Sequence, residues 1–155
     1  MKQGVLMSKS KFSLFGLALS AIIMVSITSS LHSFISAEPV VMDINKAKDP
    51  GPGFGTEKIG TLSIDAKNNT IVINANLTAT PKADKAFEAW LVDADGSNYK
   101  LSLGAFNGGQ LNVSENMVNP YTYTQFIVTE EPLSDTDPNA AGTYGGAELQ
   151  PPFGQ

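Results

Sequence analysis

Hydrophobic and polar residues alternate along most of the chain after residue 58. Leu62 and Ile64 alternate with polar residues, and Ile71, Ile73, Ala75 and Leu77 occupy every second position of the next run. Residues 67–69 between the two runs are turn formers. A period of two is typical of a strand that buries one face. The pattern therefore predicts two strands joined in a hairpin.

Further short runs of apolar and β-branched residues follow, separated by turn-forming residues. They span residues 86–92, 101–105, 111–113 and 121–129, and residues 147–149 offer one more edge strand. On the first run, Phe87, Ala89 and Leu91 share one face, and Trp90 and Val92 share the other. Six or seven short strands with no long helical stretch predict an all-β fold, an antiparallel β-sandwich of the Ig-like or Greek-key kind.

The start of the chain has the pattern of a leader. Lys2, Lys9 and Lys11 precede an apolar run over residues 12–27, and small residues end at Ala37. We expect residues 1–37 to be a helical signal peptide cleaved after Ala37. The alternative is an uncleaved membrane anchor, because the apolar run can be extended to roughly 24 residues, long enough to span a bilayer. Either way the body of the chain is expected outside the cytoplasm.

The segment after the leader shows neither a helical nor a strand period. Residues 49–53 alternate proline and glycine after an aspartate, and these residues disfavour both helices and central strands. We therefore expect residues 38–56 to be a tether and residues 57–152 to form the β-sandwich domain.

Length and charge narrow the possible partners. The chain has 155 residues, the size of one ordinary domain. All ten basic residues are lysines, and after residue 37 seven lysines face fifteen acidic residues, a formal charge of −8. This charge disfavours nucleic acid and anionic lipid as partners. We expect membrane contact only through an uncleaved leader.

The residue types that most enzymes use are missing from the body. There is no cysteine or arginine, and the single histidine is His32, beside the leader. Serine and cysteine nucleophiles activated by histidine are thereby excluded, as are histidine metal sites. Two carboxylates could still hydrolyse a glycoside, but fifteen scattered acids form such pairs by chance. We expect no enzyme, no catalytic residue, no cofactor and no metal site.

Two acidic clusters have a superficial likeness to calcium loops. They are Asp93, Asp95 and Asn98, and, within the polar loop 134–146, Asp135, Asp137 and Asn139. The spacing around Gly96 does not fit an EF-hand. A tight turn and a solvated loop are the expected structures, and weak calcium binding is the alternative at each.

Four aromatic residues could form a stacking platform for sugar rings, namely Trp90, Tyr121, Tyr123 and Tyr144. Trp90 lies within an apolar strand and is expected in the core. Tyr144 is flanked by glycines and is the better surface candidate.

Three glycosylation sequons begin at Asn68, Asn76 and Asn112. Whether they are used depends on the host. Strand alternation places Asn74 and Asn76 toward solvent if Ile73 and Leu77 face inward.

The stretches at residues 87–96, 103–106 and 126–132 resemble a known family. In order and spacing, roughly residues 59–152 are similar to the C-terminal extracytoplasmic domain of RskA-type anti-sigma-K factors. The resemblance implies a β-sandwich outside the cell, after a membrane helix. It implies no catalytic residues, because the matching positions are apolar, aromatic or turn-forming.

The sequence departs from that family before the apolar run. Only about eleven residues precede the run, where the family has a cytoplasmic domain that holds the sigma factor, and there is no cysteine for a zinc-associated motif. We expect a non-enzymatic, exported or membrane-tethered interaction module that binds an envelope or extracellular protein or a glycan. The alternatives are a membrane-anchored, anti-sigma-related signalling component and a small carbohydrate-binding domain.

Overall fold

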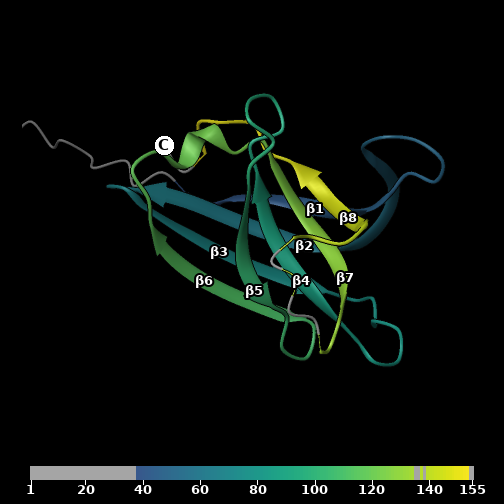
Figure 1. Ribbon diagram of the computed structural model, residues 1–155. Helices are drawn as coiled ribbons and strands as arrows, with labels where there is room; N and C mark the ends of the chain where they lie inside the picture. The colour runs from purple at the N-terminus through teal and green to yellow at the C-terminus, as the bar shows by residue number, and fades with distance from the viewer. Residues whose placement is uncertain (1–37, 135–136, 138, 154–155) are drawn as a thin grey trace, which may run out of the picture. The chain divides into compact units, whose positions relative to one another are not determined.

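The computed structural model describes residues 38–134, 137 and 139–153 (Figure 1). These residues form β1 (Val40–Ala47), β2 (Phe54–Lys67), β3 (Thr70–Leu77), β4 (Lys85–Val92), β5 (Lys100–Ala105), β6 (Gln110–Asn116), the 3₁₀ turn η1 (Pro120–Thr122), β7 (Gln125–Pro132) and β8 (Thr143–Glu148). All neighbouring strands are antiparallel. The predicted all-β antiparallel fold is confirmed. The leader and its cleavage site lie outside the described residues.

All eight strands belong to one curved sheet, in the order β5-β4-β7-β8-β1-β2-β3-β6. The two end strands, β5 and β6, follow each other in the chain and meet at the bridge between Asn107 and Gln110. Because this turn joins the first and last strands of the order, the sheet is nearly closed on itself. The two strands separate with distance from the turn, which leaves the closure incomplete (Figure 1). The result lies between a sandwich and a barrel.

The β2–β3 hairpin forms as the alternation predicts. Ile64 pairs with Ile73, and both side chains are fully buried. Asn68 and Asn69 occupy the turn with φ angles of 48° and 66°. Asparagine tolerates this left-handed region better than most residues, and two such residues in succession match the twist of a tight hairpin.

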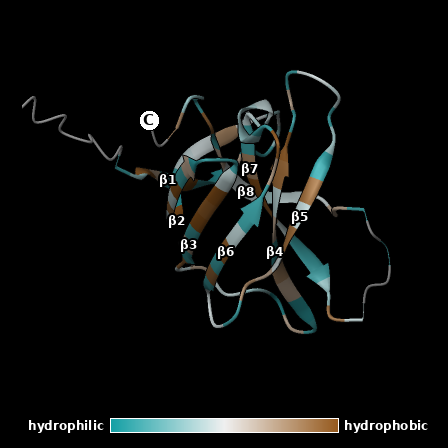
Figure 2. Cartoon of the chain, turned by 90° about the vertical axis from the view of Figure 1, so that its left-hand side faces the viewer, coloured by the Kyte–Doolittle hydropathy of each residue, from teal (hydrophilic) through white to brown (hydrophobic). Residues whose placement is uncertain are grey.

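The main core lies on the concave face of the sheet. Ile64 and Ile73 from β2 and β3 meet Phe87, Ala89 and Leu91 from β4 there, in one cluster of buried apolar side chains. The strands carry hydrophobic segments interrupted by hydrophilic ones (Figure 2), as expected when one face is buried. The predicted facing of β4 is therefore confirmed.

The predicted tether over residues 38–56 is wrong for residues 40–47, which form β1, and for residues 54–56, which begin β2. This strand pairs with β2 from Val40 opposite Ile64 to Ala47 opposite Phe54. Residues 49–53 form the loop of this hairpin, closed by a hydrogen bond of 3.0 Å from the Lys48 N–H to the Gly53 carbonyl. The sequence hides this strand because Ile44 is its only fully buried side chain.

The predicted loop over residues 134–146 is also too long, because its last four residues belong to β8. This strand is not at an edge but lies between β7 and β1. Gly145 permits the close approach of β1: a Cβ added there would lie 2.6 Å from the Asn45 carbonyl oxygen. Gly145 therefore allows close strand packing and does not mark a flexible segment.

The strand expected from Tyr121 begins four residues later, at Gln125. Pro120 starts the η1 turn, and the Asn119 side chain accepts a hydrogen bond of 3.1 Å from the Tyr121 N–H. Proline and an asparagine cap both favour such a turn over a strand.

Candidate functional site

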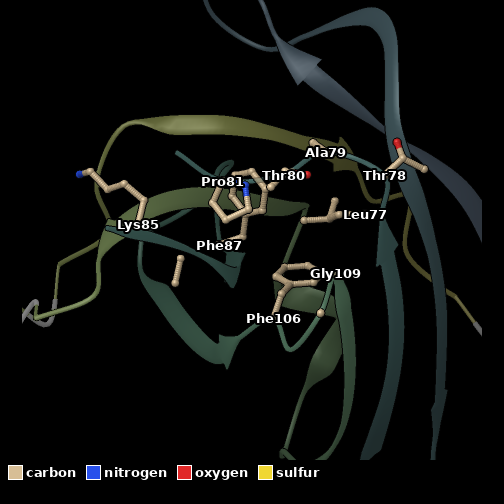
Figure 3. A pocket seen from close by; sticks show the side chains of 11 residues that line it. Leu77, Thr78, Ala79, Thr80, Pro81, Lys85, Phe87, Phe106 and Gly109 are labelled. Carbon is tan, nitrogen blue, oxygen red and sulfur yellow. The ribbon is translucent and has the colours of Figure 1, made fainter. Parts of the chain in front are cut away.

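A hollow of about 520 Å³ opens at the end of the sheet where β4 begins (Figure 3). We call it the apolar hollow because most of its side chains are apolar, although polar groups are exposed in it as well. Leu77 lines it from the end of β3, residues 78–81 from the β3–β4 connection, Phe87 from β4, and Phe106, Gly108 and Gly109 from the β5–β6 turn. The hollow thus brings together residues that are up to 32 positions apart in the chain.

Backbone hydrogen bonds fix the β5–β6 turn against this hollow. The Leu77 N–H donates to the Gly109 carbonyl over 2.8 Å, and the Phe106 N–H donates to the Phe87 carbonyl over 2.8 Å. Gly109 has a φ of 81°, and a Cβ on it would lie 2.9 Å from the Leu77 carbonyl oxygen. Only glycine fits such a close approach without strain.

The lining of this hollow combines aromatic and small apolar side chains with two threonines and one lysine. Its side chains are mainly apolar, with Phe87, Phe106 and Pro81 around one space (Figure 3). Lys85 is the one charged lining residue, and its ammonium group points away from the other lining side chains. The volume falls within the range of pockets that hold small ligands or a large apolar side chain.

Trp90 is buried, as expected, but outside the main core. It packs with Val92 and Ile127 on the opposite face of β4 and β7, and Phe54 and Ala140 pack against this cluster. Its side chain is therefore not available to stack on a ligand.

The three tyrosines of the predicted aromatic platform do not form one surface. Tyr121 contacts Phe153 with 5.3 Å between ring centroids. Tyr123 is half-buried, and burial, followed by the neighbouring Tyr99 and Asp93, raises its pKa. Tyr144 packs on Phe87 at the other end of β4, with 4.7 Å between centroids.

Asp93 organises the β4–β5 turn. Its carboxylate accepts hydrogen bonds of 2.8 Å from both the N–H and the hydroxyl of Ser97. These two bonds lower the pKa of Asp93, chiefly through the backbone N–H. The carboxylate thus has a structural role in a tight turn.

Of the second acidic cluster, Asp135 lies outside the described residues. Asp137 accepts a hydrogen bond of 3.0 Å from the Asn139 N–H. Within the part of the chain that the structure describes, no three acidic or histidine side chains are grouped so as to hold a metal ion.

The sequon residues Asn68, Asn76 and Asn112 are all exposed. Asn74 is exposed as well, while Ile73 is buried and Leu77 is half-buried against the core. The alternation argument for this strand is therefore confirmed.

Sequence reasoning missed the apolar hollow. Its signal is Phe106, a large apolar residue directly before the turn residues Asn107, Gly108 and Gly109. An aromatic side chain at a strand end, next to glycines, often lies at the rim of a sheet and not within the core. Leu77 and Phe87, which line the hollow with Phe106, could not be assigned from sequence. They come close to Phe106 only through the pairing of strands that are distant in the chain.

Comparison with known proteins gives one match. The family model for the C-terminal region of the anti-sigma-K factor rskA matches residues 16–143. Neither a curated protein nor a solved structure matches the chain. No helix among the described residues is long and apolar enough to span a bilayer. The match covers most of the chain, from the apolar run to the first residue of β8, so the protein belongs to the anti-sigma-K factor rskA C-terminal family and is an anti-sigma-factor-related domain.

Proposed function

We propose that this chain is a non-enzymatic, exported or membrane-tethered interaction domain that binds an envelope or extracellular partner protein through the apolar hollow. The observation that carries the proposal is the hollow itself. Leu77 and Phe106 are only partly buried at this hollow, whereas Phe87 is buried and belongs to the main core that the hollow adjoins. Apolar pockets of this size are favoured places for the large side chain that anchors a partner.

The absence of enzymatic activity is part of this proposal. No histidine, cysteine or arginine follows residue 37. The hollow is lined by no carboxylate, and its one amine, on Lys85, points outward. Binding needs a fitting shape and some apolar surface, and Leu77 and Phe106 supply apolar side chains at this hollow. General acid–base catalysis instead needs a proton donor or acceptor within reach of the substrate.

The location outside the cytoplasm rests on the leader pattern and on the family. The intact mass of the protein from fractionated native cells distinguishes the two forms. A soluble product starting at Glu38 supports a free exported module, and a full-length membrane product supports an anchored signalling component. Full-length protein in the cytosol would contradict both.

Binding through the hollow is tested by co-purification from cross-linked envelope fractions, quantified against the wild-type protein. We expect Phe106→Ala and Pro81→Glu each to reduce recovery of a partner at least fivefold, because the first removes apolar surface and the second places a charge at the mouth. Val72→Ala, at an exposed site on β3, is the matched control. Unchanged recovery with both hollow variants, each with a cooperative melt, would sink the proposal.

A further inference from the structure

A second hollow, of about 590 Å³, lies on the other side of the β3–β4 connection. Its lining includes Lys46 and Lys48 at the end of β1, Lys82 in the connection, Glu130 on β7 and Tyr144 on β8. It shares only Thr80 with the apolar hollow. It is therefore a distinct place on the domain.

The charge of this second hollow is opposite to that of the protein. Three of the seven lysines after residue 37 line it, against two acids, Asp49 and Glu130, which leaves a formal charge of +1. Lys85 adds a positive charge near Glu130. On a body with a formal charge of −8, such a concentration of lysine marks a local site for an anion.

Glu130 pairs with Lys82, so it offsets that lysine and leaves Lys46 and Lys48 as the charges available to a ligand. Glu130 accepts a hydrogen bond of 2.7 Å from the Lys82 N–H and lies 3.0 Å from the Lys82 ammonium. These contacts, the backbone one above all, hold the pKa of Glu130 below its ordinary value.

The two lysines on β1 and its loop keep most of their charge for a ligand. Lys46 contacts Glu57 only at 3.7 Å, with about half of its side chain exposed. Lys48 is exposed and makes no salt bridge within the described residues. A loose, exposed pair contributes little and gives way readily to a better partner.

The remaining lining groups suit a sugar. Tyr144 is half-buried, and its ring is braced by the buried Phe87 at a centroid distance of 4.7 Å. A braced aromatic ring offers a flat apolar face and a polar hydroxyl. Thr80 and Thr143 line the same hollow.

We propose that this lysine hollow binds a polysaccharide whose sugars carry carboxylates, with a ring against Tyr144 and its carboxylate at Lys46 and Lys48. An extended polymer can enter the hollow and keep away from the acidic remainder of the surface. A continuous anionic lipid surface is the less suitable partner, because it would face the −8 body as well.

The test measures binding of the purified protein to polygalacturonate by isothermal calorimetry at low and physiological salt. The matched control ligand is the methyl-esterified polymer, which keeps the rings and lacks the charge. We expect binding to the acid polymer at least tenfold tighter than to the ester, and weaker at higher salt. Equal affinity for both polymers, or no binding to either, would overturn the proposal.

Lysine variants distinguish binding at this hollow from a general attraction between the polymer and any lysine on the surface. We expect Lys48→Gln and Lys46→Gln each to weaken binding about fivefold to tenfold, as loss of a charged hydrogen bond does. Lys100→Gln removes the same charge at the first residue of β5, and we expect it to change the affinity for the polymer less than twofold. An equal effect of all three would contradict a defined site.

Tighter binding to phosphatidylglycerol vesicles than to the polymer would also contradict the proposal, in favour of a membrane surface. Neither result would test the apolar hollow, because that hollow is probed by the separate variants Phe106→Ala and Pro81→Glu.

Discussion

The indole N–H of Trp90 on β4 donates a hydrogen bond of 2.9 Å to the hydroxyl oxygen of Thr129 on the paired strand β7. Both side chains are buried, with exposed fractions of 4% and 0%. The bond lies on the face of the sheet opposite the main core, in the cluster covered by Phe54 and Ala140. The domain therefore buries apolar side chains on both faces of β4.

Thr129→Val should lower the free energy of unfolding by about 1–3 kcal/mol, because it leaves the Trp90 N–H buried without an acceptor. Urea unfolding followed by circular dichroism measures the change. Thr129→Ser keeps the hydroxyl and serves as the control, with a smaller loss from the missing methyl group. A Val variant as stable as wild type would mean that the indole N–H reaches water.

Gly146→Ala should destabilise the domain by about 1–3 kcal/mol through overpacking. A Cβ at this position would overlap the Phe126 carbonyl oxygen and the Phe54 ring, which covers the Trp90 cluster. The midpoint of thermal unfolding reports the effect.

Gly142→Ala is the matched control for that substitution, since a Cβ there has no neighbour within 4 Å. We expect its midpoint to stay within the error of the wild-type value. Equal effects at both glycines would show that β8 is not packed tightly between β7 and β1.

Asp93→Asn should remove part of the acid sensitivity of the fold. Hydrogen bonds from Ser97 lower the pKa of Asp93 in the folded protein, so its carboxylate stabilises the fold fully above its unfolded pKa, about 4. This contribution is lost as the pH falls through the folded pKa. The stability difference between wild type and variant should thus be constant above about pH 5 and shrink below pH 4. Urea midpoints between pH 3 and pH 7 measure it, and a constant difference over this range would contradict the role given to Asp93.

The parts of the fold that the sequence predicts are those with regular alternation. Ile71 and Ile73 face the core and Asn74 faces solvent, as period two requires. β1 escapes prediction because it buries only Ile44 completely. The first four residues of β8 escape because Gly145 carries no side chain to show a pattern, although close packing against β1 requires it.

The two hollows were harder to predict for a different reason. Each is assembled from separate strands, so no local spacing marks it: Leu77 and Phe106 meet only because the β5–β6 turn bonds to the end of β3. Tyr144 was identified from its flanking glycines, but the lysines around it come from β1 and the β3–β4 connection. Such groupings follow from strand order, which alternation alone does not determine.

The central claim, that the apolar hollow binds a partner outside the cytoplasm, is tested most directly by cross-linking in intact cells. A benzophenone amino acid replaces Phe106 in one strain and Tyr99 in another; Tyr99 is exposed and lies in the turn at the other end of β4. After irradiation, we expect a discrete adduct from position 106 and none from position 99, and protease added outside spheroplasts should degrade it. No adduct at position 106, equal adducts at both positions, or an adduct protected from protease would contradict the account.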